Sequence, residues 1–254
     1  MNNIPNVTFE DIIKGLEEVG VVEGDILFVH SSLKSFGNVE GGADTVIDAL
    51  LSVLGKNGTL LLPTLTFAYV NENEPFIDIK ETPCTTGIIP KTFLKRPGVV
   101  RSKHIVSSAA AFGPQAEFLT STHDDTPCDL LSPYGKLYSL GGKVLFMGAG
   151  IGSNTLFHVA EEIVLPDYMT FAPINNAKIK LEDSTIITKN FRRYNCSQSG
   201  VIRRLVKMEN IFEEKNLFKK TTVGNCLFRL ISAKDNVDTS CELLRTNPKY
   251  ILEE

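Results

Sequence analysis

Three polar side chains recur at intervals of three in the segment GSNTLFHVAEE, residues 152–162. On a helix, Thr155, His158 and Glu161 lie side by side, because positions three apart are neighbours on the helix surface. A carboxylate next to an imidazole raises the basicity of the ring and fixes which nitrogen carries the proton, as a general base requires. Glu162 has an equally suitable spacing from His158. The pattern therefore indicates a general base with an orienting acid, or else an ordinary hydrogen bond between a helical histidine and a glutamate.

A second candidate site is the polar turn in LFVHSSLKSFG, residues 27–37. Two serines and a lysine directly follow a predicted strand, and unpaired backbone N–H groups, hydroxyls and an ammonium together suit a phosphate or pyrophosphate. In the alternative, Ser31 and Ser32 only cap a helix. The glycine-rich GAGIGSNT, residues 148–155, is a weak match to a dinucleotide fingerprint and lacks its acidic partner. We interpret its glycines as allowing close approach of the backbone to a ligand or a strand.

The other residues that could do chemistry give no comparable pattern. The remaining histidines, His30, His104 and His123, are predicted in separate loops. No second His/Glu pair at helical spacing accompanies them, so we expect no metal site. No GxSxG elbow is present, which disfavours a serine hydrolase. The five cysteines form no CxxC pair and are odd in number, which suits reduced thiols.

The elements that must position these residues alternate between strands and helices. DILFVHSSL (25–33) predicts a short buried strand, GGADTVIDALLSVLGKNG (41–58) an amphipathic helix, and TLLLPTLTF (59–67) the next strand. GKVLFMGAG (142–150) predicts a third buried strand that leads into the helix of His158. This order predicts an α/β fold. The helix of His158 thus begins at the C-terminal end of a strand, where α/β folds place ligands.

The two ends of the chain differ in pattern. TFEDIIKGLEEVG (8–20) predicts a helix capped by Thr8 and ended by Gly20, whereas residues 68–83 are typical of an exposed loop. From residue 168, TIITKNFRRYN (185–195) and TTVGNCLFRLIS (221–232) alternate as antiparallel strands do, before a closing helix in AKDNVDTSCELL (233–244). We predict an α/β fold with a mixed central sheet flanked by helices and a smaller, partly antiparallel C-terminal lobe. Residues 1–254 form one domain, with a core at 1–167 and the lobe at 168–254.

Composition and charge limit the kinds of partner that this protein is expected to bind. The chain has 254 residues, 43% of them hydrophobic, and a net charge of −4, which is typical of a soluble globular protein and gives no general attraction to nucleic acid or to an anionic membrane. The longest apolar runs are interrupted well short of a membrane span, and the N-terminal residues lack the pattern of a signal peptide. We therefore expect a cytoplasmic protein with no nucleic-acid or membrane partner; a homodimer is compatible with the sequence.

An ordered series of segments resembles the aminoglycoside 3-N-acetyltransferases, also called antibiotic N-acetyltransferases. The series runs through VHSSLKSFG, GGADTVIDALLSVLGKNGTLLLPTLTF, TPCTTGIIPKTFLKRPGVVRSKHIVSSAAAFG, SPYGKLYSLGGKVLFMG and SNTLFHVAEE, and so covers most of the chain. The resemblance implies acetyl transfer from acetyl-coenzyme A to an amine of an amino sugar, without a metal, by a coenzyme-binding and catalytic core at residues 1–167.

The resemblance also implies roles for individual residues. The base and its orienting acid are matched by His158 and Glu161, with Thr155 beside them. The coenzyme's pyrophosphate is assigned to the serine turn, that is, to Ser31, Ser32, Leu33 and Lys34. The coenzyme side is further lined by Arg101, Ser102, Ser107 and Ser108. On the acceptor side we expect Thr64, Thr66 and His123.

The implied mechanism is direct transfer. His158 would take a proton from the amine while Glu161 stabilises the imidazolium that forms. The thioester oxygen needs hydrogen-bond donors as it gains charge, and either a backbone N–H near Thr64 to Thr66 or the hydroxyl of Thr155 could supply one. No cysteine lies beside the histidine in its motif, which disfavours an acyl-enzyme. A non-catalytic coenzyme- or sugar-binding module is the less favoured alternative, because Thr155, His158 and Glu161 are all present.

Two acceptors remain open: an aminoglycoside, and a nucleotide-linked amino sugar destined for a surface polysaccharide. A polycationic drug is favoured by acidic residues near the acceptor, which here would be Asp124, Asp125 or Asp129. A nucleotide sugar instead requires basic residues, for which the chain offers Arg192, Arg193, Arg203 and Arg204. These arginines could equally form a solvated surface.

Overall fold

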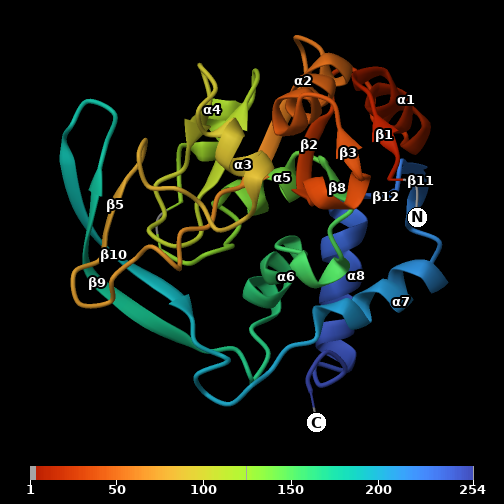
Figure 1. Ribbon diagram of the computed structural model, residues 1–254. Coiled ribbons are helices and arrows are strands. Elements are labelled where there is room, and N and C mark those ends of the chain that lie inside the picture. The colour runs from red at the N-terminus through yellow and green to blue at the C-terminus, as the bar shows by residue number, and fades with distance from the viewer. Residues whose placement is uncertain (1–3, 124, 254) are drawn as a thin grey trace.

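A computed structural model describes residues 4–123 and 125–253. A seven-stranded mixed sheet forms the centre of the molecule (Figure 1). The strand order is β11–β12–β8–β2–β4–β7–β6. Only β2 with β4 and β2 with β8 pair in parallel, and the other neighbours are antiparallel. The strands are β2 (Ile26–Ser31), β4 (Thr59–Pro63), β6 (Val100–Arg101), β7 (Ala109–Phe112), β8 (Lys143–Met147), β11 (Lys219–Val223) and β12 (Cys226–Ser232). The predicted fold class is confirmed.

Helices cover both faces of this sheet, because its central strands are apolar on both sides. Along β2, Leu27 and Val29 lie in one hydrophobic core while Phe28 lies in the other. The first core packs against α1 (Phe9–Val19), α2 (Gly42–Leu54) and α3 (Ile88–Phe93). The second packs against α5 (Pro133–Ser139), α6 (Leu156–Val164), α7 (Met208–Glu214) and α8 (Ala233–Thr246).

Local signals set the bounds of α1 as predicted. The Thr8 side chain accepts a hydrogen bond from the Asp11 N–H, and the Asp11 side chain accepts one from the backbone of Thr8. Gly20 ends the helix in the left-handed conformation, at φ 101°.

The remaining short elements are β1 (Asn6–Val7), β3 (Asn38–Val39), α4 (Ala116–Thr120) and the 3₁₀ turns η1 (Leu33–Phe36), η2 (Ile151–Ser153) and η3 (Leu205–Lys207). In the described part of the chain, no helix is both long and apolar enough to span a membrane.

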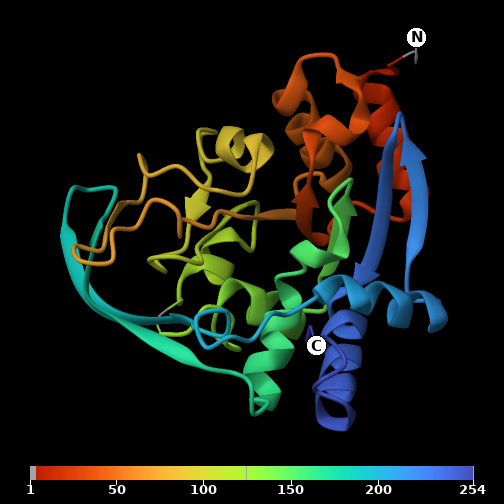
Figure 2. The same ribbon diagram turned by 60° about the horizontal axis from the view of Figure 1, so that its bottom comes forward.

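Residues 168–254 contribute to two sheets, a smaller, partly antiparallel one and the central one. Two long strands, β9 (Phe171–Lys180) and β10 (Ile186–Tyr194), form an arm that extends from the body of the molecule (Figures 1 and 2). The arm is a separate three-stranded sheet of order β10–β9–β5. By contrast, β11 and β12 extend the central sheet and α8 covers one of its faces, because their alternating apolar residues complete the two central cores.

The third strand of the arm comes from the segment expected to be an exposed loop. β5 (Phe76–Asp78) pairs in parallel with β9 across about a hundred residues of sequence. Ile77 is fully buried there and joins Ile174, Ile179 and Phe191 in a small core beneath the arm. Periodicity did not reveal this strand, because three residues are too few to show an alternating pattern.

Candidate active site

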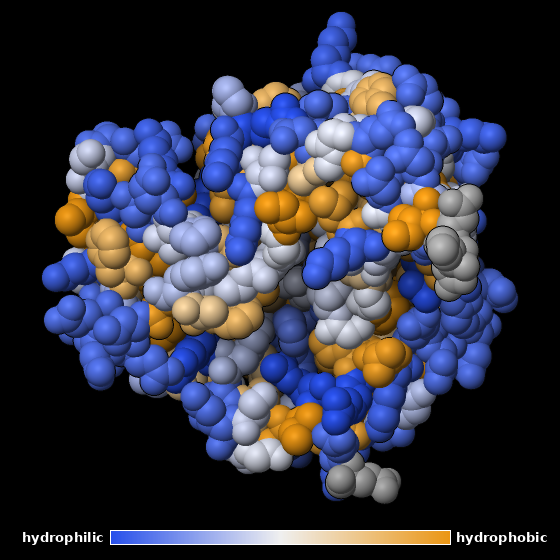
Figure 3. All heavy atoms as spheres, viewed as in Figure 1, coloured by the Kyte–Doolittle hydropathy of each residue, from blue (hydrophilic) through white to orange (hydrophobic). Residues whose placement is uncertain are grey.

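A cavity of about 930 Å³ lies between the arm and the end of the central sheet that carries α6. From the body, its walls include Ser31 at the end of β2 and His158 on α6. From the arm they include Arg193 and Tyr194, and from the loop before β5 Glu72. Figure 3 shows the surface hollowed near the middle of this face, among polar and apolar side chains. The cavity is therefore open to solvent and is bordered by the helix predicted to carry the base.

His158 and Glu161 meet on α6 as predicted. The distance from His158 Nδ1 to Glu161 Oε2 is 2.5 Å. Since the carboxylate accepts the Nδ1 proton, the Nε2 nitrogen is left as an acceptor. The His158 side chain is 19% exposed, whereas Glu161 is fully buried behind it. The arrangement presents an imidazole to the cavity and keeps its carboxylate away from water.

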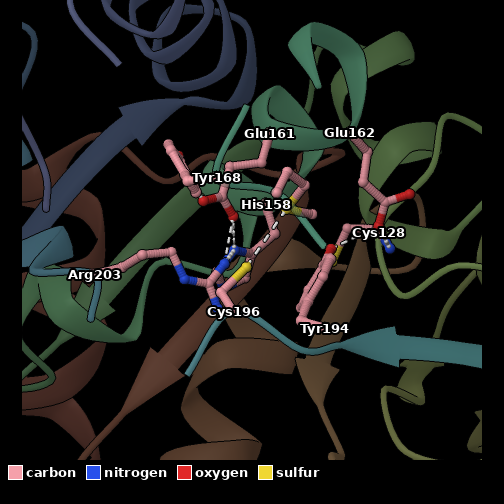
Figure 4. A network of polar contacts seen from close by, with 9 residues as sticks. Cys128, His158, Glu161, Glu162, Tyr168, Tyr194, Cys196 and Arg203 are labelled. Atoms are coloured by element: carbon pink, nitrogen blue, oxygen red, sulfur yellow. Dashed lines mark hydrogen bonds and ion pairs between the residues drawn. The ribbon is translucent and has the colours of Figure 1, made fainter. Parts of the chain in front are cut away.

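Two further donors hold the Glu161 carboxylate (Figure 4). Arg203 Nη1 lies 2.7 Å from Oε2, and the Tyr168 hydroxyl donates to Oε1 at 2.8 Å. Burial by itself would raise the pKa of Glu161, but the charge of His158, its hydrogen bond and Arg203 outweigh burial and lower that pKa. Glu161 is therefore ionised and fixed in orientation whenever the protein is folded near neutral pH.

Glu162 points to the other side of α6 (Figure 4). Its Oε1 accepts hydrogen bonds from the Cys128 N–H at 2.7 Å and from the Tyr194 hydroxyl at 2.6 Å. Burial raises the pKa of Glu162. Between the two glutamates that spacing left open, Glu161 is the partner of His158, and Glu162 connects α6 to the arm.

The comparisons with known proteins agree with this geometry. The model of the family described as aminoglycoside 3-N-acetyltransferase matches residues 28–245, which is most of the chain. The chain belongs to the aminoglycoside 3-N-acetyltransferase family. Aminoglycoside N(3)-acetyltransferase IV from Salmonella sp is 32% identical over 245 residues, covering 95% of this chain and 89% of that protein. As a member of this family, the chain is an acyltransferase.

Solved structures of similar proteins share the whole fold. A histidine-to-alanine variant of aminoglycoside acetyltransferase AAC(3)-IVa, in complex with a gentamicin, superposes with a TM-score of 0.84 at 30% identity, covering 100% of this chain and 94% of that one. YokD from Bacillus subtilis superposes with a TM-score of 0.85 at 27% identity, covering 97% and 96% of the two chains. The arm is thus part of a fold that this chain shares with both proteins.

Of the turn that the family resemblance assigns to pyrophosphate, only Ser31 lines the cavity. Its Oγ is buried and has no hydrogen-bond partner among the described residues. Ser32 precedes η1 without capping it through its side chain, Leu33 packs against the first core and Lys34 is exposed. Ser31 is therefore the residue of this turn that borders the cavity, and its buried hydroxyl has no hydrogen-bond partner among the described residues.

Arg101, also expected on the coenzyme side, is a buried cross-link. Its guanidinium donates to Ser108 Oγ and to the carbonyls of Ile79, Thr82 and Thr64. Burial lowers the pKa of Arg101 to about 10, so it stays charged at neutral pH. Since its donors are used internally, Arg101 holds the strand ends together and lies outside the cavity lining.

The three serines near Arg101 divide between the interior and the cavity. Ser102 Oγ is within 2.9 Å of His123 Nδ1, and Ser108 Oγ donates to the Thr64 carbonyl at 2.7 Å. Ser107 alone among them borders the cavity. Of the four residues expected on the coenzyme side in this segment, Ser107 is thus the one that a ligand in the cavity can reach.

The residues expected on the acceptor side are occupied elsewhere. The backbone N–H groups of Thr64 and Thr66 donate to the carbonyls of Ser108 and Val106, so neither is free to stabilise an oxyanion. His123 has both ring nitrogens engaged, with Ser102 Oγ and with the Pro127 carbonyl at 2.8 Å. None of the three borders the cavity. Thr155 does, and its side chain makes no capping bond to α6.

His30 is the cavity residue that sequence reasoning missed. It lies on β2 and not in a loop, one position before Ser31, and it borders the cavity with Thr155 and His158. Tyr168 and Arg203 were also not expected beside Glu161. The position of His30 at the end of an apolar strand was a signal that the sequence offered. The contacts of Tyr168 and Arg203 with Glu161 depend on tertiary structure alone.

The four arginines offered for a nucleotide-sugar acceptor are all paired with carboxylates. Each arginine forms an ion pair, Arg192 with Asp125, Arg193 with Glu72, Arg203 with Glu161 and Arg204 with Glu253. Asp129 accepts hydrogen bonds from the N–H groups of Leu131 and Ser132 in a turn, and Asp124 lies outside the described residues. Within the described ranges, no group of three or more His, Cys, Asp or Glu side chains is placed to hold a metal ion.

Proposed function

We propose that this protein transfers an acetyl group from acetyl-coenzyme A to an amine of an amino sugar of the aminoglycoside type. The observation that carries the proposal is the bond of 2.5 Å between His158 and Glu161 at the cavity wall. Family membership supports it, because the relatives are named aminoglycoside N(3)-acetyltransferases. A related structure holds a gentamicin, and a structure with the same fold holds coenzyme A.

His158 acts as the general base in this proposal. An ammonium cannot attack a thioester, so the acceptor reacts as the neutral amine after it has lost one proton to solvent. His158 Nε2 then accepts the second proton as the C–N bond forms. The buried Glu161 carboxylate stabilises the imidazolium across the Nδ1 bond. As the C–S bond breaks, the same proton passes from Nε2 to the leaving sulfur. Acetyl-coenzyme A supplies the activated acetyl group.

Direct transfer to the amine is supported by the state of Cys128, a thiol that borders the cavity. Burial, together with the charge of Glu162, raises the pKa of Cys128 well above its ordinary value. The thiolate, and not the thiol, is the nucleophile in acyl transfer. Cys128 is therefore poorly suited to form an acyl-enzyme, and Cys128→Ala should retain kcat to within about threefold, because no covalent step depends on it.

The residues that could hold the coenzyme fit it in part. The unpartnered Ser31 Oγ and the position of Ser107 place hydroxyls on the cavity wall, where phosphate or pantetheine groups find donors. Lys34 is exposed next to Ser31 in sequence and could add charge attraction from outside the cavity. Lys34→Ala should weaken acetyl-coenzyme A binding in titration calorimetry without changing kcat; unchanged affinity would remove Lys34 from the binding site.

A nucleotide-linked amino sugar is the weaker alternative acceptor. Its phosphates require free basic side chains, and the four arginines available in this region are already paired with carboxylates. Arg193, the one that borders the cavity, is held by Glu72. An amino sugar without phosphates needs no such cation, so the pairing supports the aminoglycoside-type acceptor.

The decisive experiment measures thiol release from acetyl-coenzyme A with a panel of aminoglycosides and amino-sugar nucleotides. We expect turnover with aminoglycosides, and His158→Ala should lower kcat by roughly 10²–10⁴-fold, the usual scale for a lost general base. Coenzyme affinity, measured by calorimetry, should stay near the wild-type value. Turnover only with sugar nucleotides would refute the acceptor, and a folded His158→Ala protein with full activity would refute the mechanism.

A further inference from the structure

His30 is a second histidine at the cavity, and neither the proposed base nor the coenzyme turn accounts for it. The ring stacks on Phe146 at a centroid distance of 5.2 Å and meets the edge of Phe28 at 4.7 Å. The residue is only 4% exposed, yet it borders the cavity together with Thr155 and His158. Its orientation is therefore fixed by packing, and what remains accessible of it faces the ligand space.

Hydrogen bonding determines which nitrogen of His30 carries the proton. The Thr155 N–H, at the start of α6, donates to His30 Nε2 at 3.3 Å. Because Nε2 serves as an acceptor, the neutral ring must carry its proton on Nδ1. Within residues 4–123 and 125–253, Nδ1 has no hydrogen-bond acceptor, and His30 borders the cavity. The Nδ1–H group thus has no partner within the described residues and belongs to a side chain at the cavity wall.

The ring is held neutral by its surroundings. Burial, reinforced by the charge of His158, lowers the pKa of His30 to about 3. The backbone N–H at the start of α6 also opposes a positive charge there. A neutral imidazole cannot act as an acid at neutral pH, but it remains a preorganised hydrogen-bond donor. Neutral histidines at helix N-termini polarise substrate carbonyls in this way in other enzymes.

We propose that His30, through Nδ1–H, donates a hydrogen bond to the acetyl carbonyl oxygen as negative charge develops on it. The inference rests on the proposed acetyl transfer and assigns the donor that the reaction needs. The N–H groups of Thr64 and Thr66, by comparison, already donate to the carbonyls of Ser108 and Val106. His30 and His158 then have complementary roles: one donates to oxygen, and the other takes the proton from nitrogen.

The first test observes the tautomer directly and does not depend on activity. Protein labelled with ¹⁵N in its histidine rings gives long-range ¹H–¹⁵N correlation spectra, and the His30→Gln variant assigns the His30 signals by their disappearance. We expect a neutral ring with the proton on Nδ1 throughout the pH range in which the enzyme is folded and active. A proton on Nε2, or titration of His30 near pH 6 to 7, would overturn the proposal.

The second test separates donation from packing. His30→Phe keeps an aromatic ring between Phe28 and Phe146 but has no N–H, so kcat should fall by about 10²–10³-fold, the scale of one lost oxyanion donor. His30→Gln keeps a donor and an acceptor, and should recover at least about tenfold of that loss. Both variants should bind acetyl-coenzyme A with affinity within about threefold of wild type, since the bond forms chiefly in the transition state.

The pH dependence distinguishes donation from a role in positioning α6. If His30 only held the helix, His30→Phe would disturb His158 and change the shape of the kcat–pH profile; we expect that shape to be unchanged. A folded His30→Phe protein with wild-type kcat would overturn the proposal. Failure of the proposed function is distinguishable, because it would show as no acetylation of any amine by wild-type enzyme while the tautomer is still observed.

Discussion

The isosteric substitution Glu161→Gln tests how the buried carboxylate acts on His158. Oε2 accepts from both His158 and Arg203, whereas among the described residues Oε1 accepts from the Tyr168 hydroxyl alone. A glutamine can therefore turn its carbonyl oxygen toward His158 and Arg203 and its amide toward Tyr168, whose hydroxyl can accept as well as donate. The His158 proton stays on Nδ1 in this arrangement. What the variant loses is the negative charge that stabilises the imidazolium.

The magnitude follows from the geometry. Two unit charges about 4 Å apart interact by about 4 kcal/mol at an effective dielectric constant of about 20, a value suited to a partly exposed histidine. Since about 1.4 kcal/mol corresponds to a tenfold change in rate, kcat should fall by about 10³-fold. Loss of the tautomer as well would cost roughly 10⁴-fold, as in serine proteases whose buried aspartate is replaced by asparagine.

Glu162→Gln is the matched control, because it makes the same change at the next residue of α6. Its carbonyl oxygen can still accept from Cys128 and Tyr194, and its carboxylate does not touch His158. We expect kcat within about threefold of wild type, a change too small to signal a lost catalytic interaction. Thiol release at saturating concentrations of both substrates is the assay. A folded Glu161→Gln enzyme within tenfold of wild type, or an equal loss in both variants, would refute the reasoning.

Three further results are expected. Arg203→Met should lower kcat by about tenfold or more, measured by thiol release, because Glu161 loses one of the donors that orient it; an unchanged kcat would show that Tyr168 suffices. Gly148→Ala should lower the melting temperature, because Gly148 has φ +69° and an added Cβ would lie 2.5 Å from Ser35 Cβ; an unchanged melting curve would contradict this. Relative to Glu161→Gln, the Glu161 carboxylate should stabilise the fold above pH 4.5, and this stabilisation should be lost as the pH falls further, because folding lowers the pKa of Glu161 from 4.5. Chemical denaturation of both proteins at pH 7 and pH 4 measures the difference in the free energy of unfolding. The same difference at both pH values would contradict the predicted sign.

Local sequence was sufficient to predict those structural features that depend on residues close together in the chain. The caps of α1 at Thr8 and Gly20 are of this kind. So is the contact of His158 with Glu161, three positions apart on one helix. Periodicity could not choose between Glu161 and Glu162, because both lie within reach of the histidine on an ideal helix. The choice is made by Arg203, 42 residues away from Glu161 in the chain.

Features that depend on contacts between distant segments were predicted poorly, because local sequence patterns do not show which segments will meet. Nothing in the polar segment around Ile77 indicates that β9 will pair with it. Arg101 is basic and lies in a segment that resembles the family, yet its guanidinium donates to three carbonyls from two separate segments, Ile79 and Thr82 in one and Thr64 in the other. Residue type alone does not distinguish an arginine that cross-links loops from one that binds a coenzyme. The hydrogen-bond acceptors around the guanidinium distinguish them.

Arg203 also connects the Glu161 carboxylate to residues 250–252. It forms an isolated β-bridge with Leu252, the neighbouring Arg204 N–H donates to the Ile251 carbonyl, and Lys207 Nζ donates to the carbonyls of Tyr250 and Leu252. The segment that orients Glu161 is thus anchored by residues 250–252. Shortening the chain before residue 250, or fusing a bulky partner that pulls this segment away, should impair turnover without touching any residue at the cavity. We therefore expect changes in residues 250–252 to act on the site from a distance, through the position of Arg203.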